Sequence, residues 1–154
     1  LDGLIIPGGE STTMLKLLCD ERLWEPLAEF GCRRPIFGTC AGAILLARKV
    51  THPVQESLGL MDIAVERNSY GRQLDSHVAR LTPAEAFARA AGPGRFEAVF
   101  IRAPRILRTG PEVQVYLYHR GDPVLVAHGP HLAATFHPEL ADDSRVHRLF
   151  LSRL

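Results

Sequence analysis

The chain has 154 residues, of which 46% are hydrophobic and 23% are charged, and its formal net charge is +1. This length fits one domain with a substantial core, and the composition is ordinary for a globular protein. Because Lys and Arg are spread along the chain, nothing favours a nucleic acid or a membrane surface as a partner. The purest apolar stretch, Ala41 to Ala47, is too short to cross a bilayer.

The first third of the chain alternates short apolar runs with helical patterns. Its predicted elements are, in order, a strand at Leu4–Ile6, a helix that Ser11 or Thr12 caps and that carries Met14, Leu15, Leu17 and Leu18, a helix over Leu23–Phe30, a strand at Pro35–Phe37 and a helix over Ala41–Lys49. Such alternation is typical of parallel α/β sheets.

The middle of the chain is richer in strand patterns. The predicted strands are Met61–Glu66, Leu74–Leu81, Phe96–Arg102, Val113–Tyr118, Val124–His128 and Leu132–Phe136, with Gly or Pro in most of the gaps. The segment 83–91 is compatible with a helix or a loop. A last helix is predicted from about Asp143, with Val146, Leu149, Phe150 and Leu154 on one face. We therefore expect residues 1–154 to form one α/β domain, a three-layer sandwich with a mainly parallel central sheet and additional antiparallel strands.

The three cysteines, Cys19, Cys32 and Cys40, form no CxxC pair, which argues against a disulfide framework or a zinc site and is consistent with a reducing cytoplasm. Only Cys40 has surroundings that suit a nucleophile, because it is the centre of a G-x-C-x-G sequence, residues 38–42, between a predicted strand and a predicted helix. The glycines would let the flanking backbones approach, and the start of the helix would favour the thiolate. The alternative is a structural cysteine in a tight turn.

A nucleophilic thiol needs a base, and the sequence offers seven histidines: His52, His77, His119, His128, His131, His137 and His147. His137 is the best candidate because it follows a predicted strand, where active sites of parallel sheets gather. In an extended segment, His137 and Glu139 would face the same side, so Glu139 could orient the ring. His131 is the second candidate. The alternative is a loop histidine beside a surface glutamate.

The segment Pro7-Gly8-Gly9-Glu10-Ser11 follows the first predicted strand and begins a helix. Gly8 and Gly9 can bring backbone N–H groups close to a developing negative charge, as an oxyanion hole requires. Phosphate binding is a second possibility, but no glycine-rich phosphate motif accompanies the segment. An ordinary turn is the simplest alternative.

The strings PGGES, GTCAG and HPE, in this order, resemble class I glutamine amidotransferases. The longer strings PGGESTTM, FGTCAG, ERNSYGRQ, VFIRAP and FHPEL are similar to those of the glutaminase subunits of pyridoxal 5′-phosphate synthases, and this resemblance covers the whole chain. It implies the class I amidotransferase fold and a catalytic triad of Cys40, His137 and Glu139. It further implies an L-glutamine site at Gly9, Glu10, Ser11, Arg67, Ile101 and Arg102. Without the resemblance, Arg67 and Arg102 would be interpreted as exposed charges at strand ends.

The resemblance also implies the reaction. A glutaminase of this kind hydrolyses L-glutamine to L-glutamate and ammonia through a thioester, needs no metal or organic cofactor, and works in the cytoplasm. Its ammonia passes to a separate synthase (lyase) subunit in a large hetero-oligomer that makes pyridoxal phosphate, a form of vitamin B6. The alternatives are the glutaminase of another amidotransferase, such as imidazole glycerol phosphate synthase, and a catalytically silent partner of a synthase.

The beginning of the chain carries one further expectation. There is no initiator Met, and Leu1 directly precedes a predicted internal strand. The resembling family has an earlier strand and helix, with a Leu-Gln-Gly segment near the oxyanion hole. We therefore expect further residues before Leu1 in the complete polypeptide.

Overall fold

The computed structural model describes residues 1–67 and 76–154. Its elements are, in chain order, β1 (Leu4–Ile6), α1 (Ser11–Asp20), α2 (Trp24–Gly31), β2 (Ile36–Thr39), α3 (Ala41–Leu46), β3 (Ala47–Thr51), β4 (Met61–Glu66), β5 (His77–Leu81), α4 (Glu85–Ala91), β6 (Phe96–Phe100), β7 (Arg105–Thr109), β8 (Gln114–His119), β9 (Asp122–His128), β10 (His131–Ala134), the 3-10 turn η1 (Pro138–Leu140) and α5 (Arg145–Leu151).

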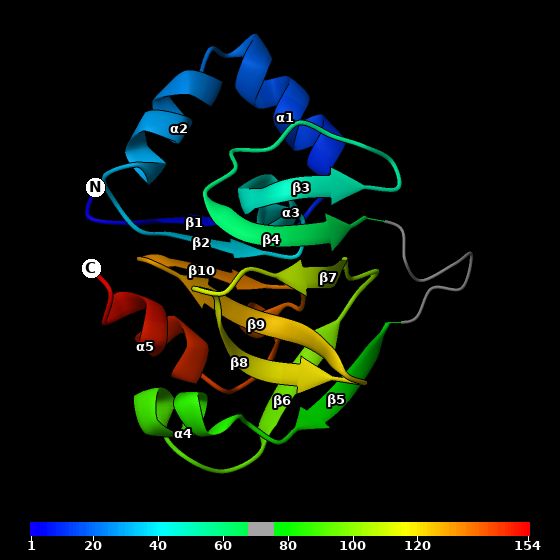
Figure 1. Cartoon of the computed structure of the whole chain (residues 1–154), viewed down its shortest axis with the longest axis vertical. Coiled ribbons are helices and arrows are strands. Elements are labelled where there is room, and N and C mark those ends of the chain that lie inside the picture. The colour runs from blue at the N-terminus through cyan, green and yellow to red at the C-terminus, as the bar shows by residue number, and fades with distance from the viewer. Residues whose placement is uncertain (68–75) are drawn as a thin grey trace.

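A five-stranded sheet in the order β1-β2-β10-β9-β8 forms the centre of the molecule. The first three strands are parallel, with Ile6 opposite Gly38 and Ala134 opposite Thr39, whereas β9 and β8 continue the sheet antiparallel. The remaining strands form two smaller sheets, β3-β4-β7 and β5-β6. In Figure 1, α1 and α2 lie at the top of the molecule, α4 and α5 lie at the bottom, and the central sheet runs between them.

The three layers follow from the alternation of buried side chains on the central strands. Phe37 and Leu132 point into a cluster with Phe150 of α5, together with residues of α4 and β6. Their neighbours Ile36 and Ala133 belong to a second cluster, on the other face, with residues of α3, β3, β4 and β7. Successive residues of a strand point to opposite faces, so a central strand that is apolar on both faces requires a layer on each side. The architecture is the predicted α/β sandwich.

Several element boundaries differ from those predicted. The helix expected over Ala41–Lys49 ends at Leu46, because the chain becomes extended at Ala47 and pairs with β4 as the new strand β3. The strand β7 was not predicted at all. The segment 83–91, for which the sequence allows a helix or a loop, contains the helix α4. The strand expected over Leu74–Leu81 begins at His77 among the described residues, and residues 74 and 75 lie outside them.

Two helix ends also differ. Neither Ser11 nor Thr12 caps α1: the N-cap is Glu10, whose carboxylate accepts the backbone N–H groups of Thr12 and Thr13. The helix α5 ends at Leu151, so Leu154 does not share its apolar face and is half exposed. Both differences lie at helix ends, where local hydrogen bonds decide the boundary and the spacing of apolar residues does not.

Candidate active site

The turn from β2 to α3 holds Cys40 in a strained backbone conformation, with φ 50° and ψ −107°. A positive φ is unfavourable for a residue with a side chain, so the surrounding structure must impose it. The glycines at either side explain how. A Cβ on Gly38 would lie 2.5 Å from the Gly42 carbonyl carbon and oxygen, and one on Gly42 would collide with the Ile6 carbonyl. The G-x-C-x-G spacing is therefore required by close backbone packing at this turn.

The same turn is tied to the strand that leads to His137. The backbone N–H of Cys40 donates to the Ala134 carbonyl oxygen at 2.8 Å, directly beyond the paired residues Thr39 and Ala134. Three residues after Ala134, the backbone N–H of His137 donates to the Val99 carbonyl oxygen at 2.8 Å. The parallel pairing of β2 with β10 thus brings residues 40 and 137 to one edge of the sheet.

His137 is oriented by Glu139. The ring Nδ1 of His137 lies 2.7 Å from Glu139 Oε1, a distance that fits an Nδ1–H donating to a carboxylate. This tautomer leaves Nε2 as an acceptor. The local conformation differs from the predicted extended segment, because residues 138–140 form the 3-10 turn η1.

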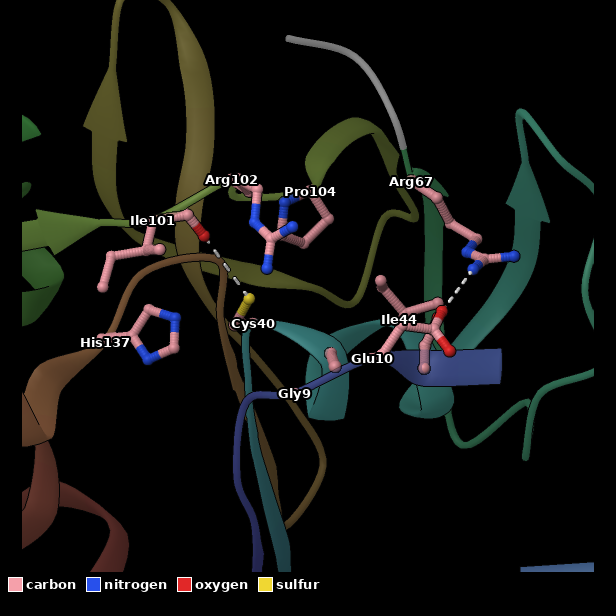
Figure 2. A pocket seen from close by; sticks show the side chains of 11 residues that line it. Gly9, Glu10, Cys40, Ile44, Arg67, Ile101, Arg102, Pro104 and His137 are labelled. Atoms are coloured by element: carbon pink, nitrogen blue, oxygen red, sulfur yellow. Dashed lines mark hydrogen bonds and ion pairs between the residues drawn. The ribbon is translucent and has the colours of Figure 1, made fainter. Parts of the chain in front are cut away.

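Gly8, in the loop between β1 and α1, packs closely against the Cys40 and His137 side chains. A Cβ at Gly8 would lie 2.5 Å from Cε1 of His137 and 3.3 Å from Cβ of Cys40. Only a residue without a side chain can occupy this place while both groups keep their positions. Figure 2 shows the His137 ring on one side of the Cys40 sulfur and Gly9 below it.

The electrostatic environment of Cys40 combines burial with two backbone N–H groups. Burial raises the pKa of the thiol above its ordinary value, whereas the backbone N–H groups of Ala41 and Gly9 and the charge of Arg102 act to lower it. Burial dominates, so the predicted stabilisation of the thiolate by the helix does not decide the pKa. The helix α3 has six residues and a small dipole. The thiol therefore needs a base to become a nucleophile.

The amides of Gly9 and Ala41 come from different parts of the chain, both act to lower the pKa of the Cys40 thiol, and both residues line one pocket with Cys40. One belongs to the residue after the candidate nucleophile, and the other to the loop after a neighbouring strand. Two donors placed in this way can hold the oxygen of a tetrahedral intermediate. Gly9 was predicted for this place. Ala41 was missed, although it directly follows Cys40 in the sequence.

A pocket of about 320 Å³ opens at this edge of the sheet (Figure 2). It is lined by Gly9, Glu10, Ser11, Cys40, Ala41, Ile44, Arg67, Ile101, Arg102, Pro104 and His137. The structure thus brings together every residue predicted for glutamine contact with Cys40 and His137. Glu139 and Gly8 are not among the lining residues. Ala41, Ile44 and Pro104 were not predicted, and the apolar side chains among them had no sequence signal that separates them from core residues.

Glu10 and Arg67 form an ion pair at the rim of the pocket. Arg67 Nη2 lies 3.2 Å from Glu10 Oε1 and donates to Thr12 Oγ1 at 2.7 Å. The hydrogen bonds that Glu10 accepts, first from the Thr13 side chain and then from the backbone N–H groups of Thr12 and Thr13, lower the pKa of its carboxyl group to about 2. Glu10 is therefore charged at neutral pH, and Arg67, largely buried, is fixed beside it.

Ile101 and Arg102 face the sulfur from the loop after β6. The thiol of Cys40 lies 3.9 Å from the Ile101 carbonyl oxygen, which can accept its S–H. Arg102 has φ 44°, so this loop, like the turn at Cys40, holds a side chain in the left-handed region. Ser11 is placed differently from expectation: its hydroxyl is turned away to Gln55.

Comparison with known proteins identifies relatives of the chain that carries this site. The family model described as the SNO glutamine amidotransferase family matches residues 1–154. The chain belongs to the SNO glutamine amidotransferase family. One relative, from Solibacter usitatus (strain Ellin6076), is called pyridoxal 5′-phosphate synthase subunit PdxT; it is 60% identical over 154 residues, which are 100% of this chain and 80% of that protein. A protein of the same name from Thermotoga neapolitana is 52% identical over 98% of this chain and 78% of its own length.

Solved structures agree with the family. A crystal structure of a glutamine amidotransferase superposes with a TM-score of 0.87 at 42% identity and covers 99% of this chain and 79% of that one. The structure of PurLQS from Thermotoga maritima superposes with a TM-score of 0.73 at 18% identity, over 98% of this chain and 79% of that one, and shows the shared fold. The predicted class I amidotransferase fold and the resemblance to this family are confirmed.

The position of His131, the second candidate base in this SNO family chain, excludes it as the partner of Cys40. His131 Nδ1 accepts the backbone N–H of Ile36 at 3.2 Å, at the start of β2, whereas Cys40 lies beyond the end of that strand.

Cys19 and Cys32 are exposed and do not line the pocket. Among residues 1–67 and 76–154, no group of three or more His, Cys, Asp or Glu side chains could hold a metal ion, and no helix is long and apolar enough to span a membrane. Residues 68–73 of the ERNSYGRQ string lie outside the described part.

Proposed function

We propose that this chain is a glutaminase that hydrolyses L-glutamine to L-glutamate and ammonia and supplies the ammonia to pyridoxal 5′-phosphate synthase. The observation that carries the proposal is the convergence of Cys40, the His137–Glu139 pair and the Gly9 amide on one pocket. Family membership and the name of the relatives support the same reaction. We further propose that residues 1–154 act as one glutaminase domain.

The first half of the proposed reaction forms a thioester. Nε2 of His137 takes the proton of the Cys40 thiol, and the sulfur attacks the side-chain amide carbon of glutamine. The carbonyl oxygen becomes an oxyanion, which the N–H groups of Gly9 and Ala41 stabilise; one such donor contributes about 3 kcal/mol. The carbon–nitrogen bond then breaks, and the imidazolium gives its proton to the departing ammonia. Glu139 keeps the ring oriented and stabilises its positive charge.

The second half returns the enzyme to its starting state. His137 takes a proton from a water molecule, and the resulting hydroxide adds to the thioester carbon. The carbon–sulfur bond breaks, glutamate leaves, and the proton on His137 returns to the Cys40 sulfur. One glutamine and one water thus give one glutamate and one ammonia, and no metal or organic cofactor enters the cycle.

The polar groups at the pocket rim suit the α-amino acid end of the substrate. Arg67 and Arg102 can pair with the α-carboxylate, and Glu10, charged at neutral pH, can accept the α-ammonium group. Ile44 and Pro104 offer apolar surface for the methylene groups between the two ends. A substrate that carries a carboxylate, an ammonium and a primary amide at its tip fits this distribution.

The partner follows from the name of the relatives. PdxT proteins are called subunits of pyridoxal 5′-phosphate synthase, and we propose that this chain likewise delivers ammonia to a synthase subunit in a large hetero-oligomer. A nucleophilic thiol that must stay reduced suits the cytoplasm, where we place the reaction.

The test is glutamate release from glutamine by the chain mixed with its synthase subunit. We expect turnover that depends on both glutamine and Cys40, and incorporation of the amide nitrogen into pyridoxal 5′-phosphate. Turnover restored only by imidazole glycerol phosphate synthase would instead assign the chain to that rival. Absence of glutamate with a synthase that binds the chain would identify a silent partner.

A further inference from the structure

Gln55, which does not line the pocket, makes a two-point contact with Ser11. The Ser11 hydroxyl donates to Gln55 Oε1 at 2.8 Å, and Gln55 Nε2 donates to the Ser11 carbonyl oxygen at 3.5 Å. Ser11 is only 2% exposed. A buried hydroxyl needs a partner, and the described structure provides this one from a position 44 residues away.

The loop that carries Gln55 is fixed to the helix of the nucleophile. It connects β3 with β4 over residues 52–60. The backbone N–H of Leu58 donates to the Leu45 carbonyl oxygen of α3 at 2.7 Å, and the Ser57 hydroxyl donates to the Ala47 carbonyl oxygen at 2.7 Å. The loop therefore links the first residue of α1 to the end of α3.

This link matters because the two amides at Cys40 belong to different segments. The Ala41 amide begins α3, and the Gly9 amide lies two residues before Ser11. The pairing of β1 with β2 ends at Ile6 and Gly38, so it does not hold Gly9 directly. Gly9 has φ 150°, a backbone conformation that glycine adopts readily and residues with a side chain rarely adopt. The nearest tie to the rest of the fold is on the α1 side, where Ser11 is held by Gln55.

We propose that Gln55 is a positioning residue for the oxyanion hole: through Ser11 it fixes the Gly9 amide relative to the Ala41 amide. This inference rests on the proposed glutaminase function. Because the oxyanion exists only in the transition state and the tetrahedral intermediate, a displaced donor lowers kcat and leaves KM nearly unchanged. The loss of one donor lowers kcat about 100- to 1,000-fold, and displacement without loss is expected to lower it roughly 10- to 100-fold.

The test compares Gln55→Ala with Glu56→Ala in the complex with the synthase subunit. Glu56 is the exposed neighbour in the same loop, and its truncation removes a side chain of the same length. We expect Gln55→Ala to lower kcat roughly 10- to 100-fold with KM changed less than about threefold, and Glu56→Ala to match the wild type. Thermal unfolding of each variant shows whether it is folded.

A double-mutant cycle with Ser11→Ala separates positioning from a general loss of structure. If Gln55 acts through Ser11, adding Gln55→Ala to Ser11→Ala lowers kcat by much less than Gln55→Ala lowers it alone. Gln55→Glu keeps an acceptor for the Ser11 hydroxyl, so we expect it to retain most of the wild-type kcat even if Gln55→Ala folds poorly.

Three outcomes overturn the inference. They are an unchanged kcat in folded Gln55→Ala, additive effects in the cycle, and a change confined to KM. In each case the wild type still releases glutamate, so the proposed function stands. If the wild type with its synthase subunit releases no glutamate, the proposed function fails, and the inference fails with it.

Discussion

The backbone N–H of Cys40 donates to the Ala134 carbonyl oxygen at 2.8 Å and so joins the turn of the candidate nucleophile to the strand that leads to the candidate base. This bond continues the parallel ladder of β2 and β10 by one step, beyond the pair Thr39 and Ala134. The separation of Cys40 and His137 is therefore set by sheet pairing, which tolerates little movement.

The first prediction concerns the nucleophile. Cys40→Ala is expected to abolish glutamate release in the complex with the synthase subunit, because no other thiol lines the pocket. Cys32→Ala, which removes an exposed thiol, is the matched control and should keep wild-type kcat. The measurement is glutamate formed per enzyme per second. Unchanged turnover in Cys40→Ala would show that the assignment of the nucleophile is wrong.

The second prediction concerns the space between Cys40 and His137. Gly8→Ala puts a methyl group 2.5 Å from His137 Cε1, so the ring must move, and we expect kcat to fall at least about 100-fold. Gly8 lies in a loop, so the melting temperature should change little. Gly42→Ala is the contrast: its methyl group meets the Ile6 carbonyl of the backbone, and both activity and thermal stability should fall. A Gly8→Ala variant with normal kcat would contradict this geometry.

The third prediction concerns the orientation of His137. Glu139→Gln keeps the size of the side chain but removes the negative charge that stabilises the imidazolium, and the amide can turn its NH2 group toward Nδ1. We expect kcat to fall between about 100- and 10,000-fold with KM nearly unchanged. Glu56→Gln, an exposed carboxylate outside the site, serves as control. A Glu139→Gln variant that loses affinity rather than kcat would point to a substrate-binding role.

The fourth prediction follows from the raised pKa of the Cys40 thiol. Burial raises this pKa, so below it the thiol is protonated and reacts slowly, and reactivity rises as the pH increases through it. The rate at which iodoacetamide alkylates Cys40 in the free protein should therefore still increase above the ordinary thiol pKa of about 8.5. Peptide mapping of the labelled protein reports Cys40 separately from Cys19 and Cys32. A rate that reaches its plateau near neutral pH would show a depressed pKa instead.

The fifth prediction concerns stability away from the site. The largely buried Arg145 donates to the carbonyl oxygens of Gly92, Pro93, Gly94 and Arg95 and pairs with both oxygens of Asp143. Its guanidinium also lies over the rings of Phe87 and Phe96. Arg145→Ala is expected to lower the free energy of unfolding by roughly 3–5 kcal/mol, because Asp143 and the carbonyl groups lose their donor.

The control for this stability prediction is Arg89→Ala. Arg89 makes an exposed ion pair with Glu85 at 3.7 Å, and its loss should change the free energy of unfolding by less than about 0.5 kcal/mol. Urea unfolding of both variants provides the measurement. The Arg145 contribution should also depend on pH: the pKa of Asp143 is lowered, chiefly by the Arg145 hydrogen bond. This stabilisation is fully present above the unfolded pKa of about 3.9 and is lost as the pH falls through the lower folded value.

Much of the candidate site could be predicted because its residues occur in short sequence motifs. Gly38 and Gly42 stand two positions from Cys40, and Glu139 stands two positions from His137, so spacing alone indicated a turn and an oriented base. The strand before each string placed both at the same edge of a parallel sheet. What spacing could not provide was the distance between the strings, because two segments of unknown register can lie side by side or several strands apart.

The errors in the element boundaries have two causes. The apolar run after Cys40 suits a long helix by periodicity, yet it ends at Leu46 because residues 47–51 gain a strand partner in β4. Glu10 rather than Ser11 caps α1, because the Glu10 carboxylate accepts the backbone N–H groups of Thr12 and Thr13. In the first case a contact with a segment distant in sequence outweighs the local preference, and in the second a local hydrogen-bond pattern decides the boundary.

The sequence by itself indicated the candidate reacting groups, their immediate neighbours and the alternation of strands and helices that is typical of an α/β sandwich, because these depend on residue type and short spacing. Only the tertiary structure decided which amides face Cys40, which way burial moves the thiol pKa, and that Gln55 holds Ser11. Those properties arise where segments that are distant in sequence pack against one another and exclude water. Burial and approach of this kind exist only after the chain has folded.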